Sequence, residues 1–268
     1  MVLYNNLEKN ERGVSESIGF MLIFTLIIVG IGLVTLYGYP LLLKQQVNAD
    51  EKIMEKNMIV LQNDVKSLAY KTVPFKETSL KIGGGSLMLF NSSYSPASST
   101  ITIRDSGGNI YVDSFHSGDL MYSSDAAGTD ISLQNGAVVM RRHAEPGSVM
   151  LAQPRWFYDG PTNTMVINLV NITSEDIMGR TGIGTVQMAL GEVNYTKIDI
   201  PVGGHFYLDY TPDPTPDGQN YLVAWDNYFR NSMKMTPTAT VNEYQLPTID
   251  TKPATLVIKN YEVFIKSL

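Results

Sequence analysis

The sequence predicts an α+β protein with a long N-terminal helix, first transmembrane and then amphipathic, followed by a mainly antiparallel, β-sandwich-like head with one short helix. Two observations lead to this fold class. The stretch Ile18–Leu43 contains no charged residue. After Pro74, short runs rich in β-branched and aromatic residues alternate with clusters of Gly, Asn, Asp and Pro, a pattern typical of strands joined by turns.

The apolar stretch is long enough to cross a membrane. As a helix, Ile18–Leu43 would extend roughly 39 Å, more than the ~30 Å hydrocarbon core of a bilayer. A water-soluble helix has a polar face, and this stretch has none. We expect a kink or break near Pro40, which lacks a backbone donor. Gly30, Gly32 and Gly38 would let another helix approach closely.

The residues just before the apolar stretch carry a family resemblance. Arg12-Gly13 is followed by Val14-Ser15-Glu16-Ser17-Ile18-Gly19-Phe20 and then by the apolar helix. A secretory signal peptide would have a shorter apolar core with a cleavage site after it. This N-terminus resembles that of archaeal type IV pilin-like proteins. The resemblance implies that a prepilin peptidase cuts between Gly13 and Val14, and that the retained helix packs with its copies or with other pilin subunits.

The resemblance is close over residues 9–45 and extends to the rest only in architecture. Many pilins carry an acidic residue five positions into the mature chain, whereas the assembly-related candidate Glu16 would be third. The Gly-rich start of archaellins is also absent, which favours a pilin-like or minor-pilin protein. The alternative is a non-polymerising, single-pass membrane-anchored extracellular domain for binding or adhesion, in which the pair Arg12-Gly13 has no role.

The domain organisation follows from these stretches. We expect a leader over 1–13, a transmembrane or filament-core helix over 14–43, an amphipathic stem helix over 44–73 and an extracellular β-rich domain over 74–268. The stem has a heptad-like apolar stripe made of Val47, Met54, Met58, Leu61, Val65 and Leu68. We expect the distal half of this stripe to pack against the chain's own β domain. The helix should end before Pro74.

Four turns are expected between strands of the head. The predicted turns are Gly83–Gly85, Asp105–Asn109, Asn135-Gly136 and Gly191–Asn194. A final strand is expected over Thr255–Phe264. A Pro/Asp loop over Thr211–Gly218 should precede a short helix over Tyr221–Met233, whose apolar residues share one face.

Composition excludes several kinds of site. The chain has no cysteine, so disulfides and cysteine-based metal sites cannot form. A net charge of −6 argues against nucleic acid as a partner. Charged residues make up 17% of the chain, below the ~25% of an average soluble domain. A surface covered instead by Ser, Thr, Asn, Gly and Tyr is common in secreted β domains.

No constellation for catalysis stands out. His116, His143 and His205 are isolated, and the chain contains no H-E-x-x-H, G-x-S-x-G, Walker or dinucleotide-binding motif. Asp213, Asp217 and Asn220 do not follow the order of a calcium loop. We therefore expect no enzyme activity, no cofactor and no metal site, with an anchored enzyme as a distant third hypothesis. Arg141-Arg142-His143 is interpreted as a solvated turn.

Three N-x-[ST] sequons are candidate glycosylation sites, at Asn91, Asn171 and Asn194. A glycosylated external domain and ordinary polar loops both explain them. Together with the composition they favour a protein in the cell membrane with its C-terminal domain outside, or in a cell-surface filament.

Overall fold

The computed structural model describes residues 5–71, 73–92, 99–213 and 221–268, with side chains from Glu16 onward. Contacts divide the chain into two compact units, which we call the N-terminal unit (Met1–Ala49) and the head unit (Asp50–Leu268). The predicted fold class is confirmed, because a long apolar N-terminal helix is followed by a mostly antiparallel β domain with a short helix.

The N-terminal unit is helical. It contains α1 (Asn5–Leu33), the π-helical segment η1 (Val34–Gly38) and the beginning of α2 (Tyr39–Lys71). The irregularity expected at Pro40 takes the form of η1, in which the N–H of Tyr39 bonds to the carbonyl of Val34. A π-turn next to a proline changes the hydrogen-bond spacing without ending the helix.

The head unit contains two sheets. The nine-stranded sheet has the order β7 (Ser148–Ala152), β6 (Ala137–Arg142), β5 (Thr129–Gln134), β4 (Asp119–Ser124), β1 (Phe75–Phe90), β10 (Met178–Ile200), β14 (Ala254–Ser267), β9 (Thr164–Thr173) and β8 (Phe157–Asp159). The five-stranded sheet has the order β12 (Thr236–Pro237), β13 (Glu243–Gln245), β11 (Phe206–Thr211), β2 (Thr100–Asp105) and β3 (Ile110–His116). Of the described strand pairs, only β14 with β9 is parallel.

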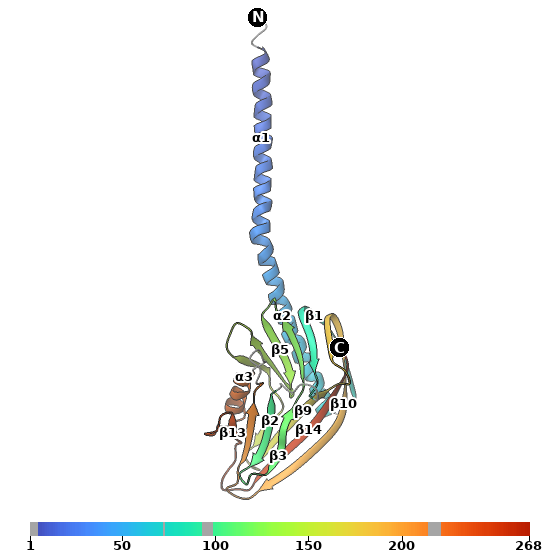
Figure 1. Ribbon diagram of the computed structural model, residues 1–268, viewed down its shortest axis with the longest axis vertical. Coiled ribbons are helices and arrows are strands. Elements are labelled where there is room, and N and C mark those ends of the chain that lie inside the picture. Colours follow the sequence, from blue (N-terminus) through green and yellow to red (C-terminus); the bar gives the residue numbers. More distant parts are fainter. Residues whose placement is uncertain (1–4, 72, 93–98, 214–220) are drawn as a thin grey trace. The chain divides into compact units, whose positions relative to one another are not determined.

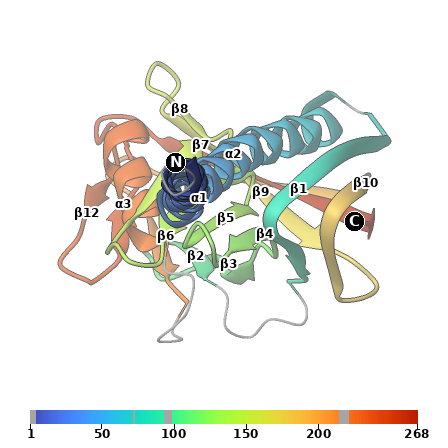
Figure 2. The same cartoon turned by 90° about the horizontal axis from the view of Figure 1, so that it is seen from above.

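The head unit is built in layers around the nine-stranded sheet. Because side chains alternate across a strand, Val138 packs with the residues of α2, while Ala137 and Val139 pack on the opposite face with the five-stranded sheet. The helical residues from Asp50 onward run across one face of the nine-stranded sheet, with β2 and β3 on its other side (Figures 1 and 2). Strand β5 and most of strand β9 are therefore buried on both faces of the sheet.

The distal half of the amphipathic stripe lies in the core of the head unit. Met54, Met58, Leu61, Val65 and Leu68 are at most 1% exposed and pack against side chains of the nine-stranded sheet. The prediction that the stem packs against its own β domain is confirmed for this half. The helix ends at Lys71, before Pro74, as predicted.

The glycines of Gly83–Gly85 do not form the predicted hairpin turn. They lie inside the continuous strand β1, at a register shift between Ile82 and Leu87. The carbonyl of Gly83 accepts a hydrogen bond from the Tyr122 hydroxyl at 2.5 Å. The carbonyl of Gly84 accepts one from Ser124 Oγ at 2.6 Å. A glycine within a strand can mark a bulge or a close approach of another group, as well as a turn. Here the three glycines form a bulge that Tyr122 and Ser124 approach closely.

The close packing at this bulge predicts that adding a single methyl group at Gly85 lowers the stability of the fold. A Cβ at Gly85 would clash with the Ser123 carbonyl and the Tyr122 ring, whereas a Cβ at Gly160 would meet only Tyr158, at 3.8 Å. We expect Gly85→Ala to lower the free energy of unfolding by about 1–3 kcal/mol and Gly160→Ala to be near neutral. Thermal unfolding followed by circular dichroism compares the two, and equal melting temperatures would contradict the described packing.

The turn predicted at Gly191–Asn194 is also wrong. Strand β10 continues through it to Ile200 and stays paired with β14, with only a register shift between Leu190 and Val193. A Cβ at Gly191 would overlap the Glu262 side chain on β14. The glycine therefore allows a bulge beside a cross-strand carboxylate and does not reverse the chain.

The other expected elements agree with the sequence. The turn Asn135-Gly136 joins β5 to β6, and both residues have the positive φ that such a turn requires (46° and 70°). Asp105–Asn109 joins β2 to β3, and the final strand is β14. The predicted helix is α3 (Leu222–Asn227) continued by η2 (Tyr228–Ser232). Most of the Pro/Asp loop lies outside the described residues.

Candidate membrane anchor and surface sites

The apolar stretch of the N-terminal unit is exposed along its whole length. Its large apolar side chains range from 44% exposed at Leu43 to 73% at Tyr37. The helix over Glu16–Lys71 contains an 18-residue window of mean hydropathy 2.6, none of which is buried. By length and composition the helix can therefore cross a membrane.

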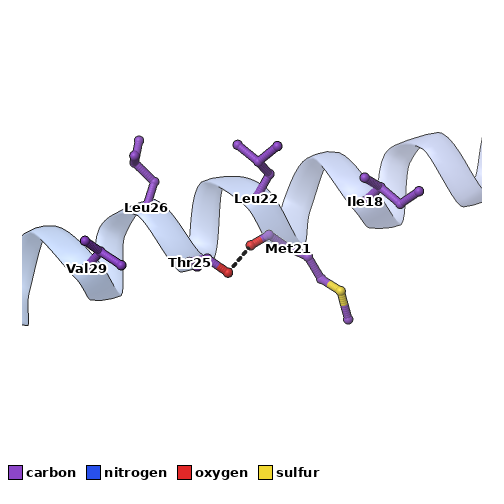
Figure 3. Close-up of a pocket in the computed structure, with 6 residues that line it drawn as sticks. All are labelled: Ile18, Met21, Leu22, Thr25, Leu26 and Val29. Carbon is purple, nitrogen blue, oxygen red and sulfur yellow. Dashed lines mark hydrogen bonds between the residues drawn. The ribbon is translucent and has the colours of Figure 1, made fainter.

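One face of this helix is lined by Ile18, Met21, Leu22, Thr25, Leu26 and Val29. Figure 3 shows the polar group of this face, the Thr25 hydroxyl, turned back toward the backbone. It donates a hydrogen bond to the Met21 carbonyl at 2.8 Å. A hydroxyl satisfied within its own helix can enter an apolar environment without an unpaired donor.

The predicted processing residues lie at the beginning of this helix. Arg12, Gly13 and Val14 fall within α1, but their side chains lie outside the described residues. Glu16 is exposed. Cleavage after Gly13 and an assembly role for Glu16 therefore remain predictions from the sequence.

The structure places the three sequons in different surroundings. Asn91 is buried, and its amide nitrogen donates a hydrogen bond to the Ser174 carbonyl at 2.5 Å. Asn171 is half-buried on β9, between covered neighbours. Asn194 is exposed on β10, as is Thr196, the third residue of its sequon. Since a glycan is bulky and needs a surface position, Asn194 is the best placed of the three acceptors.

The basic cluster Arg141-Arg142-His143 is a solvated turn only in part, since Arg142 and His143 are exposed but all three side chains have acidic partners. Arg141 and Arg142 end strand β6, and the cluster is paired with acidic groups from other elements. The Arg141 Nε–Asp130 Oδ2 and His143 Nε2–Asp130 Oδ1 distances are both 3.0 Å. Arg142 Nη2 lies 3.3 Å from Oε1 of Glu51, a buried residue of α2. The cluster thus links the stem helix and β5 to β6, and these pairings are not visible in the local sequence.

Asp119 is a buried carboxyl group of the head unit whose pKa is raised. It lies buried at the start of β4 and accepts a hydrogen bond from the Ser132 hydroxyl. Burial raises the pKa of Asp119 to about 7; the hydrogen bond from Ser132 opposes this rise, and the nearby charge of Asp130 adds to it.

The raised pKa of Asp119 predicts a pH-dependent stability. An unfolded aspartate has a pKa of about 3.9, so between pH 4 and 7 the folded chain keeps a proton that the unfolded chain has lost. The stabilisation from protonated Asp119 is complete below about pH 4 and is lost as the pH rises through about 7. We expect the melting temperature of Asp119→Asn to fall less than that of the wild type between pH 5 and 8. The exposed Asp125→Asn is the control, and parallel pH curves for wild type and Asp119→Asn would contradict the prediction.

The histidines are not gathered into a site. Among the described residues, no group of three or more His, Asp or Glu side chains could hold a metal ion. His205 Nδ1 lies within hydrogen-bond distance of the Thr248 hydroxyl (3.2 Å) and of Gln245 Nε2 (3.0 Å). Asp217 and Asn220 of the Pro/Asp loop lie outside the described residues.

Comparisons with known proteins identify a family. The sequence model of DUF7289, a family of unknown function, matches residues 12–200. No curated protein and no solved structure matches the chain. The family match includes the apolar helix, the stem helix and the head as far as the end of β10.

Proposed function

The chain belongs to DUF7289, a family of unknown function, and we propose that it is a pilin-like cell-surface protein. In this proposal the N-terminal helix inserts in the cell membrane, a prepilin peptidase removes residues 1–13, and the head unit is displayed outside. The mature helix associates with copies of itself or with other pilin subunits in a type IV pilus-like structure.

The observation that carries the proposal is the change along one continuous run of helix. From Ile18 to Leu43 the large apolar side chains are all exposed, whereas from Met54 to Leu68 the apolar stripe is fully covered by the head unit. The apolar stripe of the stem is therefore buried within its own unit, and the apolar stretch of the N-terminal unit is suited to contact lipid or a second helix. Both partners are available to a pilin-like subunit.

The assignment to the pilin class is supported by the junction at Gly13. A basic-Gly pair directly before Val14, Ser15 and Glu16 resembles a prepilin processing site. Composition, net charge and the absence of a metal cluster among the described residues are compatible with a structural role.

A substitution at the junction tests the processing step. We expect Gly13→Asp to block removal of residues 1–13 and to leave the head unit folded, because residue 13 lies outside that unit. The mass of the intact protein recovered from its native membrane, with a thermal melt of the same sample, measures both effects. Asn10→Asp, which adds the same charge three residues earlier, is the control. Normal processing of Gly13→Asp would refute the assigned junction and favour the non-polymerising anchored adhesion domain.

A further inference from the structure

Strand edges of the head unit are covered, short or irregular at the ends of both sheets. Edge β7 is covered by α3, whose Ala224 N–H bonds to Ser148 Oγ at 3.0 Å. Edge strands β8 and β12 have three and two residues. Edge β3 is broken by two register shifts and by Ser114 at a φ of 47°. These are the devices by which proteins prevent edge-to-edge pairing.

Strand β10 contains a long stretch that has a paired strand on one side only. Strand β1 pairs with β10 only as far as Ala189, and the N–H of Leu190 bonds to the Pro74 carbonyl at 3.2 Å. From Val193 to Ile200, β10 pairs with β14 on one side, and no strand of the described residues pairs with its other side. We call this segment, residues 191–200, the free edge of β10.

The free edge carries apolar side chains as well as unpaired backbone groups. Val193 is 50% exposed and Tyr195 is 76% exposed. The strand also carries one exposed ion pair, between Lys197 and Asp199 at 2.9 Å, in which the two charges offset each other. A long, regular and partly apolar edge is a template for adding a strand from another chain.

The exposed sequon lies in the middle of this edge. Asn194 and Thr196 point to one face of the strand, and Val193 and Tyr195 point to the other, because side chains alternate. Within the part of the chain that the structure describes, no hydrogen bond holds the Asn194 amide, unlike that of Asn91, which is buried and hydrogen-bonded. A group attached at Asn194 would therefore stand beside the unpaired backbone.

We propose that an N-linked glycan on Asn194 covers the free edge of β10 and prevents strand-to-strand pairing between heads. The inference rests on the proposed placement of the head unit outside the cell. The donor is a lipid-linked oligosaccharide phosphate. The Asn194 Nδ2 forms a bond to C1 of the oligosaccharide, the bond from C1 to the phosphate oxygen breaks, one amide proton is lost, and the lipid phosphate leaves.

The first test is modification of the full-length protein in its native membrane. Trypsin cleavage after Arg180 and Lys197 gives a peptide that contains Asn194. We expect this peptide to carry an oligosaccharide mass that is absent from Asn194→Gln. Protease added to intact cells reports separately whether the head unit is outside.

The second test is self-association of the full chain in mild detergent. We expect Asn194→Gln to form larger assemblies than the wild type at equal concentration, and Asn171→Gln to behave as the wild type. Adding Tyr195→Lys to Asn194→Gln should restore the wild-type size, because a lysine on an open edge opposes pairing. Sedimentation analysis measures the three variants.

The outcomes separate this inference from the proposed function. If external protease digests the head unit but Asn194 is unmodified, the glycan proposal is wrong, and the proposal of an anchored surface protein still stands. In that case, a crosslink between Lys197 residues of two copies would show a second chain on the free edge. A head protected from external protease would overturn both proposals. Glycosylation without enhanced association of Asn194→Gln would overturn the covering role.

Discussion

Ile27→Asp combined with Ile31→Asp is expected to move the protein from the membrane fraction to the soluble or aggregated fraction. Both residues lie in the centre of the apolar stretch, 53% and 62% exposed. Replacing an apolar residue by aspartate at the centre of a membrane helix costs about 3–4 kcal/mol. The pair, one helical turn apart, therefore costs roughly 6–8 kcal/mol, which is comparable to the whole gain from inserting one such helix.

A matched control separates charge from position. Gln45→Asp combined with Gln46→Asp adds the same charge to exposed helical residues beyond the apolar stretch, and we expect this variant to stay in the membrane. Fractionation with alkaline washing, followed by detection of the head unit, measures both variants. Full retention of the Ile27/Ile31 variant would contradict the membrane-anchor account.

Leu61→Ala is expected to destabilise the head unit strongly. The side chain of Leu61, on α2, is fully buried against the nine-stranded sheet. Removing a buried leucine side chain costs about 2–5 kcal/mol, through lost burial and the cavity left behind. For a domain of this size the melting temperature should fall by about 5–15 °C.

The neighbouring residue provides the control. Val60 is 47% exposed on the same helical turn, and alanine is the better helix former. Val60→Ala should therefore leave the melting temperature unchanged or slightly higher. Circular dichroism of the full chain in mild detergent compares the two variants. Equal effects at residues 60 and 61 would show that the helix does not pack in the head unit as described.

The sequence was sufficient where the signal is local and periodic. The stripe from Met54 to Leu68 repeats at helical spacing, and its buried face follows from that spacing alone. Asn135-Gly136 specifies its own turn, because both positions need a positive φ that Asn and Gly tolerate. These elements agree with the structure.

The sequence was insufficient where a residue's role depends on a distant partner. Glycine is compatible with a turn and with a bulge, and only the position of Tyr122 and Ser123 decides between them at Gly83–Gly85. Gln62 of the stem was not singled out, yet its amide nitrogen donates to the carbonyls of Gly136 at 2.7 Å and Gln153 at 2.9 Å. No local signal marks such a contact.

The same limit applies to the candidate surface sites. All three sequons satisfy one pattern, and burial alone separates Asn91 from Asn194. The free edge of β10 arises because β1 ends its pairing at Ala189 while β10 continues to Ile200. Strand pairing of this kind depends on the whole topology and cannot be derived from the residues of one strand.

The most direct test of the central proposal is the N-terminal peptide of the protein recovered from its native membrane. A prepilin-type subunit should have a mature chain that starts at Val14, with the apolar helix retained. Identification of that peptide by mass spectrometry would support processing and make assembly through the helix the working hypothesis. A chain that still carries residues 1–13 would contradict the pilin-like account and leave a single-pass anchored domain.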